Sequence, residues 1–324
     1  METTQTKVTD IDSVLDNLTI DCKTLCKDIK AIRDIECVDG VFGKFMGSNS
    51  FKEAVRLGIE KPKNNELFRN HITAELASVY ETSSIWNHCV SKPFGYPGDF
   101  AILELVYNQQ AHQNTPTAIG QWIDKWSIST VLPRAVKARK NALRYYLESF
   151  VEDRKQLGKQ QILSIACGSA REIRELPKPT LENASIHLLD HDERALDFIK
   201  SLMLSRPEDH DLHFIEANAL KPFATKGNFD LIYSFGLYDY LKDETLDKSI
   251  QLSLEHLKED GTFLFALKDH RFYPQWFYDW FYDWRFVSRT VDDGYEIASN
   301  NGLEVKELIT VETGTINLFV CKRV

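Results

Sequence analysis

The stretch Ile162-Leu-Ser-Ile-Ala-Cys-Gly-Ser-Ala-Arg-Glu-Ile173 decides the fold of this chain. Its apolar start, within a strand candidate at Gln161–Ile165, has the length of a buried strand, and a helix is expected after residue 170. The small residues between them suit a tight loop that a ligand can approach closely. An alternative is that Ser169 and Glu172 form a Ser-x-x-Glu capping box that only starts the helix. The loop by itself therefore leaves ligand binding open.

Further short apolar runs follow this stretch and alternate with helical patterns. That alternation predicts a parallel sheet whose strands are connected by helices. The last two runs are joined closely through residues 312–315, with Gly314 as the turn residue, so they are read as a hairpin that adds one antiparallel strand. The other strand candidates, after the first, are Ser185–Leu189, Leu212–Ile215, Phe229–Ser234, Thr262–Leu267, Leu303–Val311 and Ile316–Cys321.

The first half of the chain is predicted to be helical. Apolar residues recur there mostly at three- and four-residue steps, which is typical of amphipathic helices. The helical stretches are Val8–Ile32, Asn65–Cys89, the residues from Asp99 to Val106, and Pro133–Val151. We therefore expect an all-helical N-terminal domain over residues 1–155 and an α/β domain over residues 156–324.

Composition excludes several classes of protein. The 324 residues include 39 Lys and Arg against 48 Asp and Glu, which gives a net charge of −9, and 43% are hydrophobic. A disordered chain would be poorer in apolar residues. A nucleic-acid-binding protein would need concentrated positive charge, so neither a nucleic-acid coat nor a tRNA or rRNA enzyme is expected.

The cysteines and the chain start point to a reducing compartment. The six cysteines are scattered and form no Cys-x-x-Cys pair, which favours free thiols over disulfides or structural zinc. Neither a secretory signal pattern at the N-terminus nor an apolar run long enough to span a membrane is seen. The nine histidines show no metal-ligand spacing, so no metal is expected. A cytoplasmic protein is predicted.

A second motif places a carboxylate at the end of a strand. Ile186-His-Leu-Leu-Asp190 ends in an acid about 20–25 residues after the small-residue loop, the range expected for the acid that binds ribose in nucleotide-binding βαβ units. A carboxylate can accept hydrogen bonds from both ribose hydroxyls. The alternative for Asp190 is a surface turn, and Asp192 is expected to cap the helix that follows.

Two more strand ends carry polar residues. Asn218 follows the third strand, where its amide could meet the edge of an adenine ring or simply form a turn. The fourth strand ends at Ser234 and continues into Gly236-Leu-Tyr-Asp-Tyr240-Leu. Ligands of open α/β sheets bind at this carboxyl edge.

Taken together, the order and spacing of these motifs over residues 158–324 resemble the class I S-adenosylmethionine-dependent methyltransferases. The resemblance implies a Rossmann-like α/β fold with a seven-stranded, mostly parallel sheet and S-adenosylmethionine as cofactor. In the family, the first loop holds the methionine part, the acid after the second strand holds ribose, and the residue after the third strand meets adenine. Carried over, the expected cofactor-binding residues are Ser164, Ala166, Cys167, Gly168, Asp190, His191, Asn218, Ala219, Ser234 and Gly236.

This sequence departs from the family pattern in the first loop. Ser164 stands where the family usually has an acid, and Ala166 and Ala170 stand where it has glycines. Since alanine disfavours positive φ, we expect a negative φ at both alanines and a slightly different loop.

The N-terminal half adds a narrower resemblance. Lys92-Pro-Phe-Gly-Tyr96-Pro-Gly-Asp99-Phe100, together with the loop and with 236–241, is similar to a bacterial methyltransferase subfamily that includes enzymes of 3-hydroxypalmitic acid methyl ester biosynthesis. It implies O-methylation of a small molecule, with the carboxylate of a hydroxy fatty acid as one acceptor. Tyr96 and Asp99 would then face the cofactor from a helical cap; the alternative is a rigid interdomain turn with Asp99 as a helix cap.

Residues beyond the fourth and fifth strands are the candidates for chemistry. Methyl transfer needs alignment and exclusion of water, and a base only if the acceptor arrives protonated. The catalytic candidates are Tyr238, Tyr240 and Arg271, of which Arg271 could pair with a substrate carboxylate or be an ordinary surface residue. Asp239, Tyr273 and Trp276 are further substrate-binding candidates.

An aromatic block spans residues 272–286 and contains a direct repeat, Trp276-Phe-Tyr-Asp followed by Trp280-Phe-Tyr-Asp. It could line a substrate pocket, but we expect most of it to pack as core, with two or three rings touching substrate. It could also form the surface of a homodimer.

Three functions remain open. The favoured one is methylation of an oxygen atom. An N-methyltransferase of a small amine or amino acid is the first alternative, with Asp99, Asp239 and the aromatic residues holding a cation. The second is an S-adenosylmethionine-binding interaction module that has lost catalysis.

Overall fold

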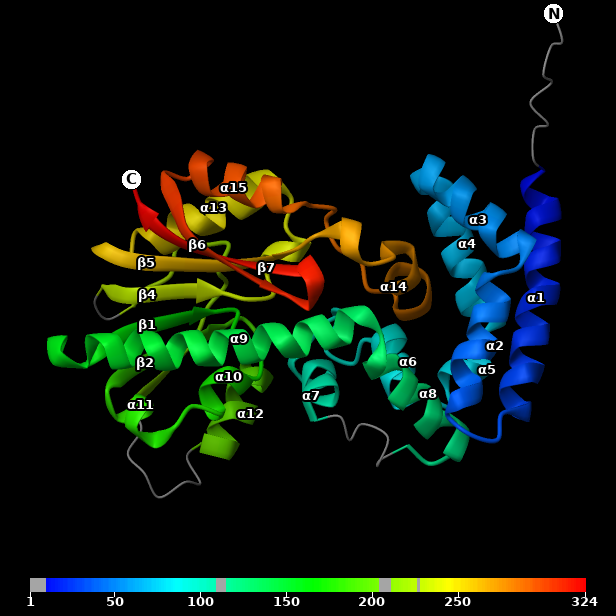
Figure 1. The fold of residues 1–324 in the computed structure, drawn as a ribbon, viewed down its shortest axis with the longest axis horizontal. Coiled ribbons are helices and arrows are strands. Elements are labelled where there is room, and N and C mark those ends of the chain that lie inside the picture. Colours follow the sequence, from blue (N-terminus) through cyan, green and yellow to red (C-terminus); the bar gives the residue numbers. More distant parts are fainter. Residues whose placement is uncertain (1–9, 109–114, 204–210, 226–227) are drawn as a thin grey trace, which may run out of the picture. The chain divides into compact units, whose positions relative to one another are not determined.

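The computed structural model describes residues 10–108, 115–203, 211–225 and 228–324 (Figure 1). Contacts divide the chain into two compact units, each built from separate segments. Unit 1 comprises Met1–Gly98, Asn108–Thr130 and Gln275–Arg285, and unit 2 comprises Asp99–Tyr107, Val131–Pro274 and Phe286–Val324. The predicted domains, 1–155 and 156–324, differ from these units because residues 99–107 and 131–155 lie in unit 2 and residues 275–285 lie in unit 1.

Unit 2 is built on a seven-stranded sheet with the order β3-β2-β1-β4-β5-β7-β6. Strands β1 to β5 run parallel, and β7 pairs antiparallel with both β5 and β6. The predicted α/β sheet with one antiparallel strand is therefore confirmed, as is the final hairpin. The strands are β1 (Gln160–Ile165), β2 (Ala184–Asp190), β3 (Leu212–Glu216), β4 (Phe229–Ser234), β5 (Leu257–Lys268), β6 (Leu303–Val311) and β7 (Ile316–Arg323).

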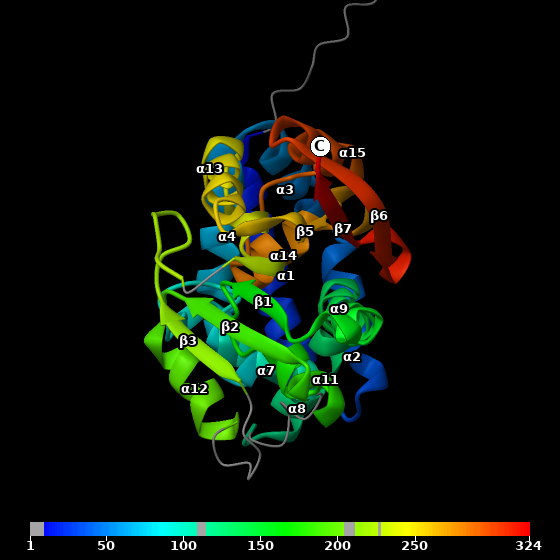
Figure 2. The ribbon, with the colours of Figure 1, turned by 90° about the vertical axis from the view of Figure 1, so that its left-hand side faces the viewer.

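Helices cover both faces of this sheet (Figures 1 and 2). Side chains alternate along β1, so that Ile162 joins the cluster under α9, α10 and α12, whereas Leu163 joins the cluster under α13 and α15. Burial on both faces explains the nearly continuous apolar strands. The helices of unit 2 are α7 (Phe100–Asn108, whose last residue counts with unit 1), α9 (Val131–Arg154), α10 (Arg171–Arg174), α11 (Lys178–Glu182), α12 (Glu193–Met203), α13 (Asp243–Leu254) and α15 (Val291–Asn300), with short 3₁₀ turns η2 (Lys155–Leu157), η3 (Tyr238–Tyr240), η4 (His270–Phe272) and η5 (Glu312–Gly314).

The described part of unit 1 is helical. The stretch Asn65–Cys89, read from the sequence as one helical region, forms three helices, since the backbone leaves helical geometry at Leu76 and again before Ser83, which caps the next helix. The first two residues of the predicted helix Val8–Ile32 lie outside the described residues. The helices are α1 (Ile11–Ala31), α2 (Glu36–Met46), α3 (Asn49–Glu60), α4 (Pro62–Glu75), α5 (Ala77–Tyr80), α6 (Ser84–Ser91), α8 (Ala118–Ser129) and α14 (Gln275–Tyr282).

The aromatic repeat supplies the core of unit 1. Trp280 and Phe281 are buried against aromatic rings of other helices, such as Phe281 against Trp86 at 5.8 Å between ring centroids. The repeat's Asp279 accepts a hydrogen bond from the Asn65 amide at 2.6 Å, and the Trp280 indole N–H donates to the same amide's oxygen at 2.6 Å. The expectation that most of these aromatics pack as core is met in α14.

No helix within the described ranges is long and apolar enough to cross a bilayer.

Candidate functional site

The carboxyl ends of β1, β2, β3 and β4 meet at one edge of the sheet in unit 2. The register pairs Ile165 with Leu189 on one side and with Ser234 on the other. The strand order places β1 between β2 and β4, so the chain connections diverge on either side of β1. Such a point, where the strand order reverses, is where open α/β sheets bind ligands.

The loop after β1 adopts left-handed backbone at three positions. The φ angles are 53° at Ala166, 54° at Gly168 and 43° at Ala170. The expectation of negative φ at the two alanines is therefore wrong. Hydrogen bonds to the second strand hold the loop in this form, because the Cys167 N–H donates to the Leu189 carbonyl at 3.0 Å and the Gly168 N–H donates to Asp190 Oδ2 at 2.8 Å. Each alanine carries a steric cost of about 1–2 kcal/mol in this region.

The capping-box alternative for this loop is also wrong. The residue that caps α10 is Ala170, which offers no side-chain hydrogen bond, and Ser169 lies one position earlier. Glu172 instead turns inward: it is 8% exposed, and its Oε1 accepts a hydrogen bond from the Tyr233 hydroxyl at 2.8 Å. Burial raises the pKa of the Glu172 carboxyl above its ordinary value, against the hydrogen bond from Tyr233 and the nearby arginines.

The Asp190 side chain connects the loop after β1 with the turn that follows β2. Besides accepting from Gly168 with Oδ2, it accepts the Asp192 N–H with Oδ1 at 3.0 Å, and it is 4% exposed. This is not an exposed surface turn. Asp192 takes the role of helix cap as predicted, since its Oδ1 accepts the Arg194 N–H at 3.0 Å in the first turn of α12.

A cavity of about 200 Å³ opens beside these loops. It brings together four of the predicted cofactor-binding residues, Ala166, His191, Asn218 and Ala219. The side-chain oxygen of Asn218 accepts the Leu220 N–H at 2.8 Å, so the turn geometry and a place in the cavity occur together. The remaining lining is apolar and consists of Leu189, Ala217, Leu220 and Leu237. Apolar walls with a few fixed polar groups suit a flat heterocycle attached to a sugar.

The other predicted cofactor-binding residues do not line this cavity. They are close in sequence to residues that line it, or they lie within the strands of the sheet. Ser164 and Ser234 are each 1% exposed, and the Ser234 hydroxyl has no hydrogen-bond partner among the described residues. Burial raises the pKa of the Cys167 thiol well above its ordinary value, so this thiol is not an activated nucleophile. Gly236 follows β4 directly, and a Cβ there would lie 3.8 Å from a guanidinium nitrogen of Arg139.

Sequence reasoning did not identify Arg139. This α9 residue is 4% exposed, and its Nη1 donates to the carbonyl of Phe235 at 2.5 Å. The signal was available, because Arg139 falls on the apolar face of its helix, three residues after Val136 and four before Leu143. A charge on a buried helix face requires an explanation.

The predicted catalytic residues are not collected at one place. Tyr238 is fully buried in the apolar cluster under α13, so packing accounts for its position. Arg271 is exposed and forms a two-point ion pair with Asp269, with Nη2 at 2.6 Å from Oδ2, which matches the surface alternative. The Tyr240 ring lies 5.4 Å from that of Phe286.

Lys268, at the end of β5, was also missed. It is 3% exposed and forms a buried ion pair with Asp239, whose Oδ1 accepts the Lys268 backbone N–H at 2.8 Å as well. Burial lowers the pKa of Lys268 to about 8, although Asp239 opposes this shift. Its Nζ lies 4.2 Å from the centroid of the Phe286 ring. Asp239 is thus already engaged with a cation.

The predicted substrate-binding residues are divided between the two units. Tyr96 and Trp276 belong to unit 1, and Asp99, Asp239 and Tyr273 belong to unit 2. Asp99 is 1% exposed and caps α7, since its Oδ1 accepts the N–H groups of Ala101 and Ile102, each at 2.9 Å. The predicted helix cap at Asp99 is therefore present, and the roles of Tyr96 and Asp99 toward a substrate stay predictions. Tyr273 is buried, with its ring 6.3 Å from that of Phe286.

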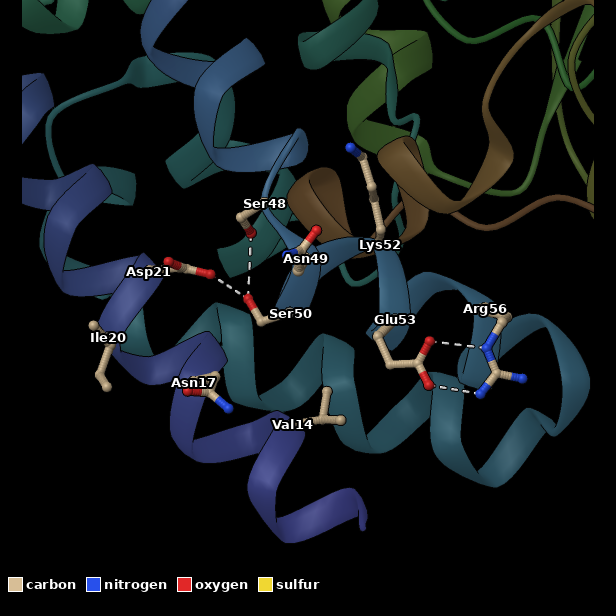
Figure 3. Close-up of a pocket in the computed structure, with 10 residues that line it drawn as sticks. All are labelled: Val14, Asn17, Ile20, Asp21, Ser48, Asn49, Ser50, Lys52, Glu53 and Arg56. Atoms are coloured by element: carbon tan, nitrogen blue, oxygen red, sulfur yellow. Dashed lines mark hydrogen bonds and ion pairs between the residues drawn. The ribbon is translucent and has the colours of Figure 1, made fainter. Parts of the chain in front are cut away.

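A larger hollow, of about 850 Å³, lies in unit 1 between α1 and α3 (Figure 3). Several of the polar side chains drawn there bind one another: the Ser50 hydroxyl donates to Asp21, and Arg56 pairs with Glu53 on the same helix at 2.6 Å. None of the predicted site residues lines it. Within the described residues, no group of three or more His, Cys, Asp or Glu side chains could hold a metal ion.

Comparisons with known proteins agree with this picture of unit 2. Residues 162–261 match the family model of the methyltransferase domain. Among solved structures, a possible exported protein from Bordetella parapertussis aligns over 100% of both chains at 12% identity, with a TM-score of 0.58, which shows a shared fold.

Two methyltransferases align over shorter parts of the chain. Magnesium protoporphyrin IX methyltransferase from Synechocystis, solved with bound S-adenosylmethionine, is 11% identical over 59% of this chain and 83% of its own, with a TM-score of 0.45. Mitomycin 7-O-methyltransferase is 12% identical over 66% of this chain and 60% of its own, with a TM-score of 0.47. No curated protein sequence matches significantly.

Proposed function

We propose that the protein is a methyltransferase that uses S-adenosylmethionine to methylate an oxygen atom of a small molecule. The match of residues 162–261 to the model of the methyltransferase domain supports this proposal. The carboxylate of a hydroxy fatty acid is our first candidate for the acceptor. The observation that carries the proposal is the cavity at the carboxyl ends of β1, β2 and β3, which gathers Ala166, His191, Asn218 and Ala219 beside the Asp190 carboxylate.

The residues present fit the nucleoside end of S-adenosylmethionine. A volume of about 200 Å³ is below the roughly 300–1,000 Å³ of pockets that enclose a whole ligand. The cavity is therefore sized for part of the cofactor. Leu189 and Leu237 would pack against the adenine faces, and Asp190, which already accepts one backbone N–H with each oxygen, would accept ribose hydroxyls with its remaining lone pairs.

When bound, the cofactor supplies an activated methyl group on a sulfonium, which is transferred by direct displacement. The chain then has two tasks, to align the acceptor and to exclude water. The loop 166–170, fixed to β2 by the hydrogen bonds to Leu189 and Asp190, is a rigid support for this alignment. A carboxylate acceptor arrives already ionised, so no side chain has to remove a proton.

An oxygen acceptor is favoured over an amine because the two carboxylates that could bind a cationic amine already have partners within the protein. A cationic amine would need an acidic counter-charge, and Asp99 and Asp239 were the candidates for it. Asp99 is occupied in capping α7, and Asp239 is ion-paired with Lys268. The preference for a hydroxy fatty acid rests on the resemblance of residues 92–100 and 236–241 to the bacterial subfamily. A cytoplasmic location and a homodimer stay predictions.

The test begins with calorimetric titration of the protein with S-adenosylmethionine and S-adenosylhomocysteine. We expect micromolar binding of both. Hydroxy fatty acids, shorter hydroxy acids and primary amines are then incubated with the protein and S-adenosylmethionine, and the products are analysed by mass spectrometry for the addition of one methyl group.

Mild alkali separates the two kinds of product, because it hydrolyses a methyl ester and leaves an N-methyl group in place. Ester formation supports the proposal, and an alkali-resistant product from an amine contradicts it. Tight cofactor binding without turnover of any acceptor would favour a binding module that has lost catalysis.

A further inference from the structure

We propose that Arg139 and Glu172 bind the amino-acid end of S-adenosylmethionine, with Arg139 holding its carboxylate and Glu172 its ammonium group. The inference rests on the proposed function and extends it to the part of the cofactor that the small cavity cannot hold. Both residues belong to unit 2 and both are buried, at 4% and 8% exposure.

Arg139 is a buried cation that forms no ion pair among the described residues. Among the described residues, no carboxylate lies within 4 Å of its guanidinium. Its Nη1 donates to the Phe235 carbonyl at 2.5 Å, and its guanidinium lies 5.5 Å from the centroid of the Phe235 ring. A guanidinium has five N–H donors in a planar fork that suits a carboxylate. Leaving such a charge buried without a counter-ion is costly, and a bound carboxylate would supply one.

Arg139 points at the place where the amino-acid end of the cofactor is expected. Its two terminal nitrogens lie 3.8 and 3.9 Å from the position of a Cβ built on Gly236, directly after β4. The next residue, Leu237, lines the nucleoside cavity, as does Ala166 at the start of the β1 loop. A ligand whose nucleoside occupies that cavity can therefore extend between the β1 loop and residue 236 toward Arg139.

Glu172 is held close to the first strand of the sheet through Tyr233. Ser164 and Tyr233 are partners in the register of β1 and β4, and the Tyr233 hydroxyl donates to Glu172 at 2.8 Å. The Glu172 carboxyl is thereby held next to the strand β4 position that pairs with Ser164 of β1. The Tyr233 ring lies 5.8 Å from the Phe235 ring, and the Arg139 guanidinium lies 5.5 Å from the centroid of that Phe235 ring, so neighbouring rings connect Glu172 with Arg139.

A zwitterion is the ligand that this pair fits best. One cation and one anion, both desolvated, match an α-ammonium carboxylate without adding net charge to the interior. The neighbouring Arg174 is already committed, because it pairs with Glu104 and donates from Nε to the Ser169 carbonyl at 2.8 Å. Of these two arginines, Arg139 is the one that forms no ion pair among the described residues.

The test compares ligands with and without this end. Wild-type protein, Arg139→Gln and Glu172→Gln are titrated with S-adenosylhomocysteine and with 5′-methylthioadenosine, which lacks the amino-acid end. We expect each variant to bind S-adenosylhomocysteine about 10–100-fold more weakly than wild-type protein does, which corresponds to the loss of one charge-assisted hydrogen-bonding group. The affinity of each variant for 5′-methylthioadenosine should equal that of wild-type protein. Arg144→Gln is the matched control, because Arg144 lies on the same helix and pairs with Glu148 at 3.0 Å; both affinities should be unchanged.

A measurement on wild-type protein keeps the test valid if a variant does not fold. Decarboxylated S-adenosylmethionine lacks only the carboxylate and should bind at least about 10-fold more weakly than S-adenosylmethionine. Equal binding of the two overturns the assignment of Arg139, as does an unchanged preference for S-adenosylhomocysteine in Arg139→Gln. The assignment of Glu172 is overturned if Glu172→Gln keeps that preference. A wild-type protein that binds the nucleoside ligands without these preferences refutes only this inference, whereas one that binds none of them refutes the proposed function too.

Discussion

Asp190 is expected to have two separable roles, and its replacement tests the ribose assignment. The carboxylate would accept two ribose hydroxyls, and hydrogen bonds to a charged group contribute about 1.5–3 kcal/mol each. Asp190→Ala should therefore weaken binding of S-adenosylhomocysteine by about 3 kcal/mol or more, which is about 100-fold. Calorimetric titration measures this directly.

The same substitution should also lower the stability of the fold. The N–H groups of Gly168 and Asp192 both donate to Asp190, and each would lose its acceptor. An unsatisfied buried donor costs about 1–3 kcal/mol, so the loss of both acceptors should lower the free energy of unfolding by about 2–6 kcal/mol in urea denaturation. Asp190→Asn keeps one acceptor oxygen and should lose about half of that amount.

Asp192→Asn is the matched control, because Asp192 caps α12 next to the same loop. It should change the stability little, because Asn caps helices about as well as Asp, and it should leave cofactor affinity unchanged. The reasoning is refuted if Asp190→Asn binds S-adenosylhomocysteine like wild type. It is equally refuted if Asp192→Asn loses as much affinity as Asp190→Asn, since the effect would then come from loop order alone.

Three further predictions concern stability. Ala170→Gly should raise the free energy of unfolding by about 0.5–1 kcal/mol, because glycine adopts a φ of 43° without strain. Gly168→Ala, at a φ of 54°, should lower the free energy of unfolding by about 1–2 kcal/mol. Urea denaturation measures both changes, and a destabilised Ala170→Gly variant would contradict the account of the loop. Burial lowers the pKa of His187 to about 4, so the unfolded chain binds more protons between pH 6.5 and 4, and stability should fall as the pH drops through that range, by up to about 3 kcal/mol. His187→Gln should flatten this part of the pH profile, and an unchanged profile would exclude His187 as its source. In unit 1, Gly120→Ala would place a Cβ 1.7 Å from a backbone oxygen and should lower the free energy of unfolding by about 3 kcal/mol or more. A Cβ at Gly40 meets no atom within 4 Å, so Gly40→Ala should stabilise its helix by about 0.5–1 kcal/mol. Similar effects of the two substitutions would refute the steric reasoning.

The sequence by itself determined the architecture of the sheet. Short apolar runs that alternate with helical patterns are produced by strands buried on both faces, and β4 (Phe229–Ser234) and β6 (Leu303–Val311) occur with the predicted bounds. The place of Asp190 at a strand end, and of Asp192 as a cap, could also be read locally. Backbone geometry fixes what a residue at such a position can do.

Only the tertiary structure decided the details of the site. The positive φ of Ala166 and Ala170 occurs in a loop that hydrogen-bonds to β2, whose residues are distant in sequence, so local preference pointed the wrong way. Glu172 looked like a capping residue until its contact with Tyr233, 61 positions away, was seen. In the same way, Asp239 looked available for substrate and is paired with Lys268.

The aromatic block shows the same division between local and long-range information. Its composition indicated that these aromatic residues would be buried, but not which helices they would pack against. Trp280 bonds to Asn65, 215 positions earlier, which places α14 in a unit otherwise made from the first 130 residues. The periodicity of apolar residues predicts which face of a helix is buried, because residues three or four positions apart share one face. The partner that covers this face depends on contacts between distant parts of the chain, and these leave no local pattern in the sequence.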